Sequence, residues 1–93
     1  MLILMIIKIR HINLFRLFIE NMESLDLHGK SYEDSKILAS IFVENNIDNL
    51  PIEIITGNSV EMKKIVLDIT RKYNLKVSPK THYNLGCLII NNS

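Results

Sequence analysis

The order of apolar segments is the feature that most constrains how this chain can fold. From Ser24 onward, short runs of apolar and β-branched residues alternate with two segments in which apolar residues recur with a helical period. Strands and helices that alternate in this way pack as two layers, with the helices against a sheet. The chain has 93 residues, of which 47% are apolar, so it can form one small domain with a single core.

Two helices are predicted. Ser31 is a suitable N-cap, with Asp34 three residues later, and the helix continues to about Asn46. The apolar face expected for this helix consists of Ile37, Leu38, Ile41 and Phe42. Asn58 is a suitable N-cap for a second helix, with Glu61 at its third helical position. The apolar stripe expected for that helix consists of Met62, Ile65, Val66, Ile69 and Tyr73.

Four strands are predicted around these helices. They are Ser24–Leu27, Pro51–Thr56, Lys76–Ser78 and Gly86–Ile90. Pro79 is expected to end the third strand, because proline lacks the N–H that a strand needs for pairing. The last run is almost wholly apolar, which predicts a central strand that is buried on both faces. The order βαβαββ therefore predicts an α/β fold, a two-layer sandwich of two helices on a mixed four-stranded sheet.

Residues 1–21 differ from the rest of the chain, because a seven-residue apolar run leads into a segment that mixes basic and apolar residues. A membrane span needs about 20 mostly apolar residues, and Lys8, Arg10 and Arg16 argue against one here. A secretory signal would carry its charge before the apolar run. Two interpretations remain: an amphipathic helix that docks to a membrane surface or a partner, or an extension upstream of a start at Met22. We therefore expect an N-terminal extension over 1–21 and an α/β domain over 22–93.

Charge and cysteine content narrow the function classes. A formal net charge of +1 argues against a polybasic protein, so any contact with nucleic acid must be local. Cys87 is the only cysteine, which excludes an internal disulfide and a cysteine-rich zinc site. We expect Cys87 to act as a small apolar residue in a buried strand, and the protein to be cytoplasmic.

Asp26 and His28 are the first candidate functional residues. They lie two positions apart at the end of the first predicted strand, so both side chains should point toward the same face, while Leu27 points into the core. Gly29 follows directly and permits a sharp turn and the close approach of a ligand to the main chain. An acid and an imidazole are therefore predicted together at one edge of the sheet.

A second candidate site is the turn Thr56-Gly57-Asn58-Ser59. Like the first turn, it follows the carboxyl end of a strand, where open α/β sheets bind ligands, so the two turns could form one site. It also leads into a helix N-terminus, whose free N–H groups favour an anion such as phosphate. Thr56 and Ser59 add hydroxyl groups. The alternative interpretation is that both are ordinary, well-capped turns.

The segment from Lys63 to Lys80 is basic, with six basic residues against Asp68 alone. A cationic patch beside an anion-binding turn suits a phosphodiester ligand. The alternative is a solvated helix face in which Lys64, Asp68 and Lys72 are spaced as partners. Tyr83 could stack on a base, but general burial statistics favour an aromatic residue that covers the edge of the core.

Three short motifs resemble, in order, those of the Smr (small MutS-related) domain. They are Leu25-Asp26-Leu27-His28-Gly29, then Thr56-Gly57-Asn58-Ser59, then Asn84-Leu85-Gly86 before an apolar strand. The first matches the LDxHG motif that opens a helix in that family, and the second corresponds to its TGxG or HGxG turn. The resemblance covers residues 24–90. It implies a fold like that of the C-terminal domain of a bacterial translation initiation factor, and a nicking DNA endonuclease or an RNA-cleaving enzyme.

One position departs from the family pattern. Ser59 stands where the family has the last glycine of the turn, and a serine adopts positive φ less readily and hinders close approach of the backbone to a ligand. A serine can instead cap the helix and donate a hydrogen bond to phosphate. The substitution therefore bears on activity more than on fold.

The resemblance and the phosphate-binding turn together predict phosphodiester hydrolysis. His28 would act as general base on water or as general acid for the leaving oxygen, because histidine exchanges protons near neutral pH. Asp26 would orient His28 or bind a divalent cation such as Mg²⁺ or Mn²⁺. The residues predicted to bind phosphate or nucleic acid are Gly29, Thr56, Gly57, Asn58, Ser59, Lys63, Lys64 and Lys80.

Two other functions remain open. Ser59 suggests a non-catalytic DNA- or RNA-binding module of the same fold. A protein-interaction domain would dock through residues 1–21 and would have no salt-dependent affinity for nucleic acid. The sequence does not distinguish DNA from RNA, and it makes no prediction of the oligomeric state.

Overall fold

The computed structural model describes residues 22–93, so both interpretations of the extension lie outside the described residues. The elements, in chain order, are β1 (Ser24–Asp26), α3 (Tyr32–Asn45), the 3-10 helix η1 (Ile47–Asn49), β2 (Ile52–Ile55), α4 (Val60–Lys72), β3 (Leu75–Thr81) and β4 (Asn84–Asn92). The predicted order of strands and helices is confirmed. The boundaries differ from the predicted ones by a few residues, most at β3 and β4.

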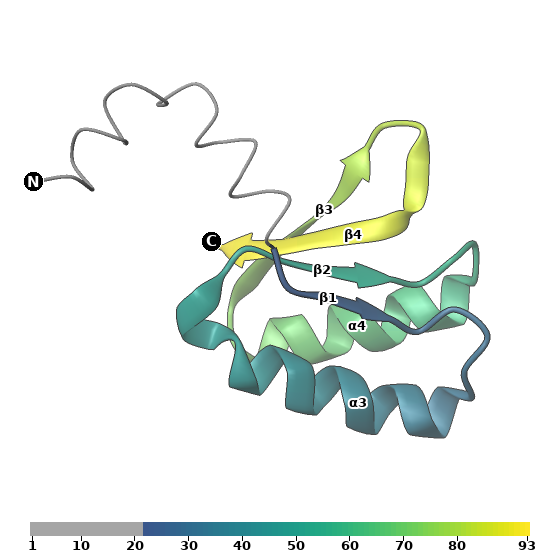
Figure 1. Ribbon diagram of the computed structural model, residues 1–93, viewed down its shortest axis with the longest axis horizontal. Coiled ribbons are helices and arrows are strands. Elements are labelled where there is room, and N and C mark those ends of the chain that lie inside the picture. The colour runs from purple at the N-terminus through teal and green to yellow at the C-terminus, as the bar shows by residue number, and fades with distance from the viewer. Residues whose placement is uncertain (1–21) are drawn as a thin grey trace, which may run out of the picture.

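The four strands form one mixed sheet in the order β1-β2-β4-β3. Strand β1 is parallel to β2, whereas β4 is antiparallel to both β2 and β3. Both helices cover the same face of the sheet (Figure 1), which confirms the predicted two-layer sandwich. Strand β4 is internal, and Cys87, Leu88 and Ile90 on it are buried, as its apolar sequence predicted.

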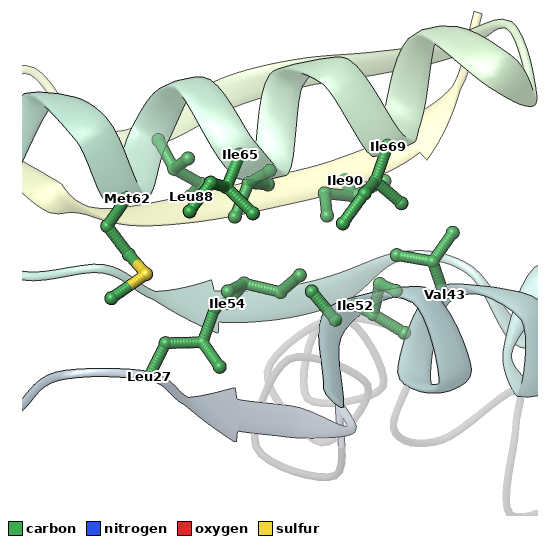
Figure 2. Close-up of a cluster of buried hydrophobic side chains, with 11 residues drawn as sticks. Leu27, Val43, Ile52, Ile54, Met62, Ile65, Ile69, Leu88 and Ile90 are labelled. Carbon is green, nitrogen blue, oxygen red and sulfur yellow. The ribbon is translucent and has the colours of Figure 1, made fainter. Parts of the chain in front are cut away.

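The core lies between the sheet and the helices. Side chains of α4 point toward those of β2 and β4, and Leu27 and Val43 complete the cluster (Figure 2). The buried residues of α4 include four of the five predicted for its apolar stripe: Met62, Ile65, Val66 and Ile69. Tyr73 is the exception, because the helix ends there and its side chain remains partly exposed.

Helix α3 begins as predicted but presents a different face to the core. The Ser31 hydroxyl accepts a hydrogen bond of 3.1 Å from the Asp34 amide, which is the predicted N-cap. The buried residues of α3, however, are Ser35, Ala39 and Val43. The predicted face is wrong, since Ile37 and Ile41 are 60% and 52% exposed and only Phe42 packs against the core. Small side chains spaced by four residues let α3 approach its neighbours closely, and this packing fixes the rotation of the helix.

Two expectations near the β3–β4 hairpin are also wrong. Strand β3 continues through Pro79, which pairs with Leu88, and the register shifts between Pro79 and Thr81. An edge strand tolerates this proline because only one side of β3 is hydrogen-bonded. Tyr83, at the turn of the hairpin, is 81% exposed and does not cover the core. Its ring instead lies edge-on against His82, with centroids 5.0 Å apart.

Candidate functional site

The two candidate turns meet at one end of the sheet. Strands β1 and β2 are parallel and end together, and the Leu27 amide donates a hydrogen bond of 2.8 Å to the Ile55 carbonyl at this point. The chain leaves both strands at the same end of the molecule, from which α3 and α4 start (Figure 1). The turns that follow Leu27 and Ile55 are therefore neighbours, as the sequence predicted.

The first turn is built around Gly29. The Lys30 amide donates to the Leu27 carbonyl over 3.0 Å, and Gly29 has a φ of +78°, which a side chain would disfavour. Asp26 accepts a hydrogen bond of 2.9 Å through Oδ1 from the backbone N–H of His28. The carboxylate thus holds the main chain of His28 in place, and its bond is to this amide and not to the imidazole ring.

The second turn rests on the start of β4. Gly86 accepts hydrogen bonds through its carbonyl from the amides of Thr56, at 2.8 Å, and Gly57, at 3.1 Å. The Thr56 hydroxyl donates to the Gly57 carbonyl over 3.0 Å. Gly57 has a φ of +67°. A Cβ on Gly86 would lie 3.0 Å from the carbonyl carbon and oxygen of Gly57, so a glycine at position 86 lets the two backbones touch.

Ser59, and not Asn58, is the N-cap of α4. Its hydroxyl accepts a hydrogen bond of 3.1 Å from the Met62 amide, which corrects the predicted cap by one residue. Ser59 has a φ of −73°, in a region open to every residue, so this turn does not need a glycine at that position. The sequence expectation that a serine can cap the helix is confirmed.

Side chains of the first turn lie against the second. A Cβ on Gly57 would be 3.3 Å from Cδ2 of His28, which places the imidazole beside the Gly57 main chain. The Tyr32 hydroxyl lies 3.4 Å from Oγ of Ser59. The imidazole of the first turn and the phenol at the start of α3 therefore border the second turn and the N-terminus of α4.

The space between the turns is a pocket of about 570 Å³. Its lining residues are His28, Gly29, Lys30, Ser31, Tyr32, Thr56, Gly57, Asn58, Ser59 and Met62. Six of these were predicted site residues: His28, Gly29, Thr56, Gly57, Asn58 and Ser59. The other four, Lys30, Ser31, Tyr32 and Met62, were not predicted as site residues, although the first three follow the first motif in the sequence. The position of these three in the sequence could have identified them, because the residues that connect a strand end to the next helix line the same pocket as the motif.

The predicted acid and lysines lie outside the lining of this pocket. Asp26 is on β1, one position before the turn, and Lys63 and Lys64 are in the first two turns of α4. Lys80 is on β3, where its Nζ is 2.8 Å from Oε2 of Glu53. Among the described residues, Lys30 is the one basic side chain that lines the pocket. The predicted partners of Asp68 were Lys64 and Lys72, but its ion pair is with Arg71, at 3.5 Å.

The Glu53–Lys80 ion pair lies on the face of the sheet opposite the helices. Glu53 alternates with Ile52 and Ile54, which face the core, and it is buried to 9% exposure. Its Oε1 accepts a hydrogen bond of 2.9 Å from the Ser24 hydroxyl. Burial raises the pKa of Glu53, but the hydrogen bonds from Lys80, Cys87 and Ser24 and the positive charge of Lys80 together lower it by more, so its net pKa is below the usual 4.5. Hydrogen bonding and charge from Glu53 raise the pKa of Lys80.

Glu53→Gln is expected to destabilise the protein at neutral pH and to have little effect in acid. The contribution of a carboxylate with a lowered pKa is fully present above its usual value of 4.5 and is lost as the pH falls through the folded-state value. Because Lys80 is partly exposed, we expect a loss of about 1 kcal/mol in the free energy of unfolding at pH 7. Urea denaturation at pH 7 and pH 3 measures this. A difference between the two proteins that grows in acid would contradict the assignment.

Cys87 is expected to be unreactive in the folded protein. It is buried as predicted, and burial first, then hydrogen bonding and the charge of Glu53, raise its pKa to about 11. Since the thiolate is the reactive form, iodoacetamide should modify Cys87 at pH 8 at least about ten times more slowly in native than in urea-unfolded protein. Mass spectrometry over time gives both rates. Equal rates would show that the thiol is accessible.

The described part of the chain has neither a cluster of metal ligands nor a helix that could cross a membrane. Residues 22–93 contain no group of three or more His, Cys, Asp or Glu side chains placed to hold a metal ion. Neither α3 nor α4 has the length and apolar content needed to cross a membrane.

Comparison with known proteins identifies no relative. No protein-family model matches the chain, and neither a curated protein nor a solved structure is significantly similar to it. The class of protein is therefore described from the structure itself, as an α/β sandwich with a pocket at the carboxyl ends of β1 and β2. The resemblance to the Smr domain rests on the three motifs alone, and the activity that it implies is a proposal.

Proposed function

We propose that this protein is an Smr-like nucleic-acid endonuclease that hydrolyses phosphodiester bonds in DNA or RNA. The observation that carries the proposal is the position of the His28 imidazole, which lies beside the Gly57 main chain and in the same pocket as the N-terminus of α4. A proton-transfer group and main-chain N–H donors at one site both promote attack on a phosphate, the first by moving a proton and the second by stabilising the negative charge. The resemblance of the motifs to the Smr domain supports the same reaction.

In the proposed mechanism, His28 takes a proton from a water molecule as that water attacks phosphorus. The bond between phosphorus and the leaving oxygen breaks, and that oxygen takes up a proton to form a hydroxyl, which leaves a phosphate monoester on the other product. The amides of Asn58 and Ser59 would hold the phosphate at the positive end of the α4 dipole. Asp26 positions His28 through the hydrogen bond to its backbone N–H.

Basic residues would bind the flanking backbone. Lys30 lines the pocket and is the nearest candidate, while Lys63 and Lys64 lie on the first turns of the helix that begins there. Lys80 is engaged by Glu53, so we assign it a structural role in this proposal. The oxygen of Asp26 that is not bonded to His28 is the candidate ligand for Mg²⁺ or Mn²⁺, since Mg²⁺ needs only one or two carboxylates in addition to substrate oxygens. A cytoplasmic location suits the free thiol of Cys87.

A non-catalytic DNA- or RNA-binding module is the second candidate. It is favoured by the hydrogen bond of Asp26, whose carboxylate holds the main chain of His28 and not its ring. In this alternative the pocket binds a phosphate but lacks an oriented proton acceptor. The two candidates predict the same salt-dependent affinity and differ only in turnover.

Incubation of the purified full chain with supercoiled plasmid and with structured RNA tests both candidates. We expect nicked plasmid or shortened RNA, and each reaction is repeated with Mg²⁺, with Mn²⁺ and with a chelator. A gel shift without cleavage under all of these conditions would support the binding module. A protein that shows no binding and no cleavage would contradict both candidates.

A further inference from the structure

We propose that Tyr32 is a base-stacking residue that makes this site select unpaired nucleotides over duplex nucleic acid. This inference rests on the proposed function and names its substrate class. It starts from the position of Tyr32, the first residue of α3, which lines the pocket together with His28 and with the turn that would bind phosphate.

The exposure and the contacts of Tyr32 suit a role at the surface of the pocket. Its side chain is 48% exposed, and it is not part of the hydrophobic core. Its hydroxyl lies 3.4 Å from Oγ of Ser59, so the ring spans from the first turn to the N-terminus of α4. An aromatic ring left partly in water beside a pocket offers a surface on which a base can stack, at little cost in side-chain entropy.

One nucleotide could place its phosphate at the proposed phosphate position and its base on the Tyr32 ring. Asn58 and Ser59 line the pocket together with Tyr32, and the Tyr32 hydroxyl, at the start of α3, contacts the side chain of Ser59. A phosphate on the amides of Asn58 and Ser59 therefore has an aromatic ring next to it. In a duplex the bases are stacked inside the helix, so only an unpaired or extruded base can reach such a ring.

A second exposed aromatic residue lies at the same end of the sheet. Tyr83 is 81% exposed and precedes Gly86, which contacts Gly57, by three residues. In an extended strand this separation is about 10 Å. The hairpin that carries Tyr83 rises on the side of the sheet away from the helices (Figure 1). Tyr32 and Tyr83 are thus exposed aromatic residues, one lining the pocket and the other three residues from the glycine that supports the Gly57 turn. Proteins that bind single strands stack bases on exposed aromatic residues.

Fluorescence anisotropy with three labelled probes tests this inference. The probes are a 12-nucleotide single strand, the duplex of the same sequence, and a 12-residue abasic strand that has the phosphates but no bases. The full-length protein should bind the single strand about 5- to 150-fold more tightly than the abasic strand, which is the range for stacking of one base. It should also prefer the single strand to the duplex. A gel run after each titration confirms that the probe is intact.

Variants assign the effect to one ring. Tyr32→Ala should remove the preference for the single strand and leave the affinity for the abasic strand unchanged, while Tyr32→Phe should keep the preference because the ring remains. Tyr73→Ala is the matched control, since Tyr73 is also partly exposed but lies at the opposite end of α4. It should behave like the unmodified protein.

The possible failures are distinguishable. Equal affinity for duplex and single strand, or an equal loss of affinity for all three probes in Tyr32→Ala, would overturn the stacking role while leaving the proposed nuclease intact. A Tyr32→Ala protein with unchanged preference would do the same. If the protein binds none of the probes, both this inference and the proposed function are wrong.

Discussion

His28→Ala is expected to lower the rate of the proposed phosphodiester cleavage by about 10²- to 10⁴-fold, the usual contribution of a positioned general acid or base. The reason is geometric, because the imidazole lies against the Gly57 main chain at the rim of the pocket, where a phosphate held by the amides of Asn58 and Ser59 would be attacked. Binding of the uncleaved substrate should change little, since the amides and Lys30 remain. Initial rates and dissociation constants, measured on the same substrate, separate the two effects.

The chain offers a matched control for this experiment. His82 is a second exposed histidine, at the turn between β3 and β4, where its ring contacts Tyr83. His82→Ala should retain the cleavage rate of the unmodified protein. A His28→Ala protein that cuts as fast as the His82→Ala protein would show that the imidazole at position 28 does not transfer the proton.

Features encoded by neighbouring residues were predictable from the sequence. The Ser31 cap depends on Asp34, three residues away, and the β-branched run Ile52–Ile55 depends on intrinsic strand preference. The central position of β4 follows from a run that is apolar at successive residues, which indicates burial on both faces. The two turns were placed together because parallel strands end at the same edge of a sheet.

Features that depend on contacts between distant residues were not predictable. The rotation of α3 is decided by what it packs against, so Ser35, Ala39 and Val43 are buried, while Ile37, Leu38 and Ile41, three of the four large apolar residues predicted for that face, are exposed. The sequence placed Lys80 in a basic segment, but in the folded protein Lys80 forms an ion pair with Glu53, which lies on another strand. Local propensity also could not show that Pro79 lies on an edge strand, where a missing N–H is tolerated.

In the candidate site, too, features set by neighbouring residues were predictable and features set by distant contacts were not. Its motifs identified the residues of both turns, because each turn is a local sequence of strand end, glycine and helix cap. The support beneath the second turn comes from Gly86, 29 residues after Gly57, and only the folded chain shows that their backbones touch. The sequence placed Gly86 in the third motif, and the structure supplies a physical reason for a glycine there.

Gly86→Ala is expected to destabilise the protein by about 1–3 kcal/mol and to displace the Gly57 turn, as overpacking of a tight contact does. The added Cβ would lie 3.0 Å from the main-chain carbon and oxygen of Gly57, and a backbone cannot move aside as the end of a flexible side chain can. The shift would weaken the hydrogen bonds from the Thr56 and Gly57 amides to the Gly86 carbonyl. Urea denaturation measures the stability, and the cleavage assay reports the displaced site.

Gly29→Asn separates this steric effect from the loss of a glycine as such. Gly29 needs its positive φ of +78°, but nothing lies within 4 Å of the position its Cβ would take. Asparagine tolerates this backbone region, so Gly29→Asn should cost less than about 1 kcal/mol. At position 86 the penalty should instead grow with side-chain size, from alanine to valine, because the obstacle is the Gly57 backbone. A Gly86→Val protein as stable as Gly29→Asn would mean that the two backbones are not in contact, and the second turn would then lack the support that holds it beside His28.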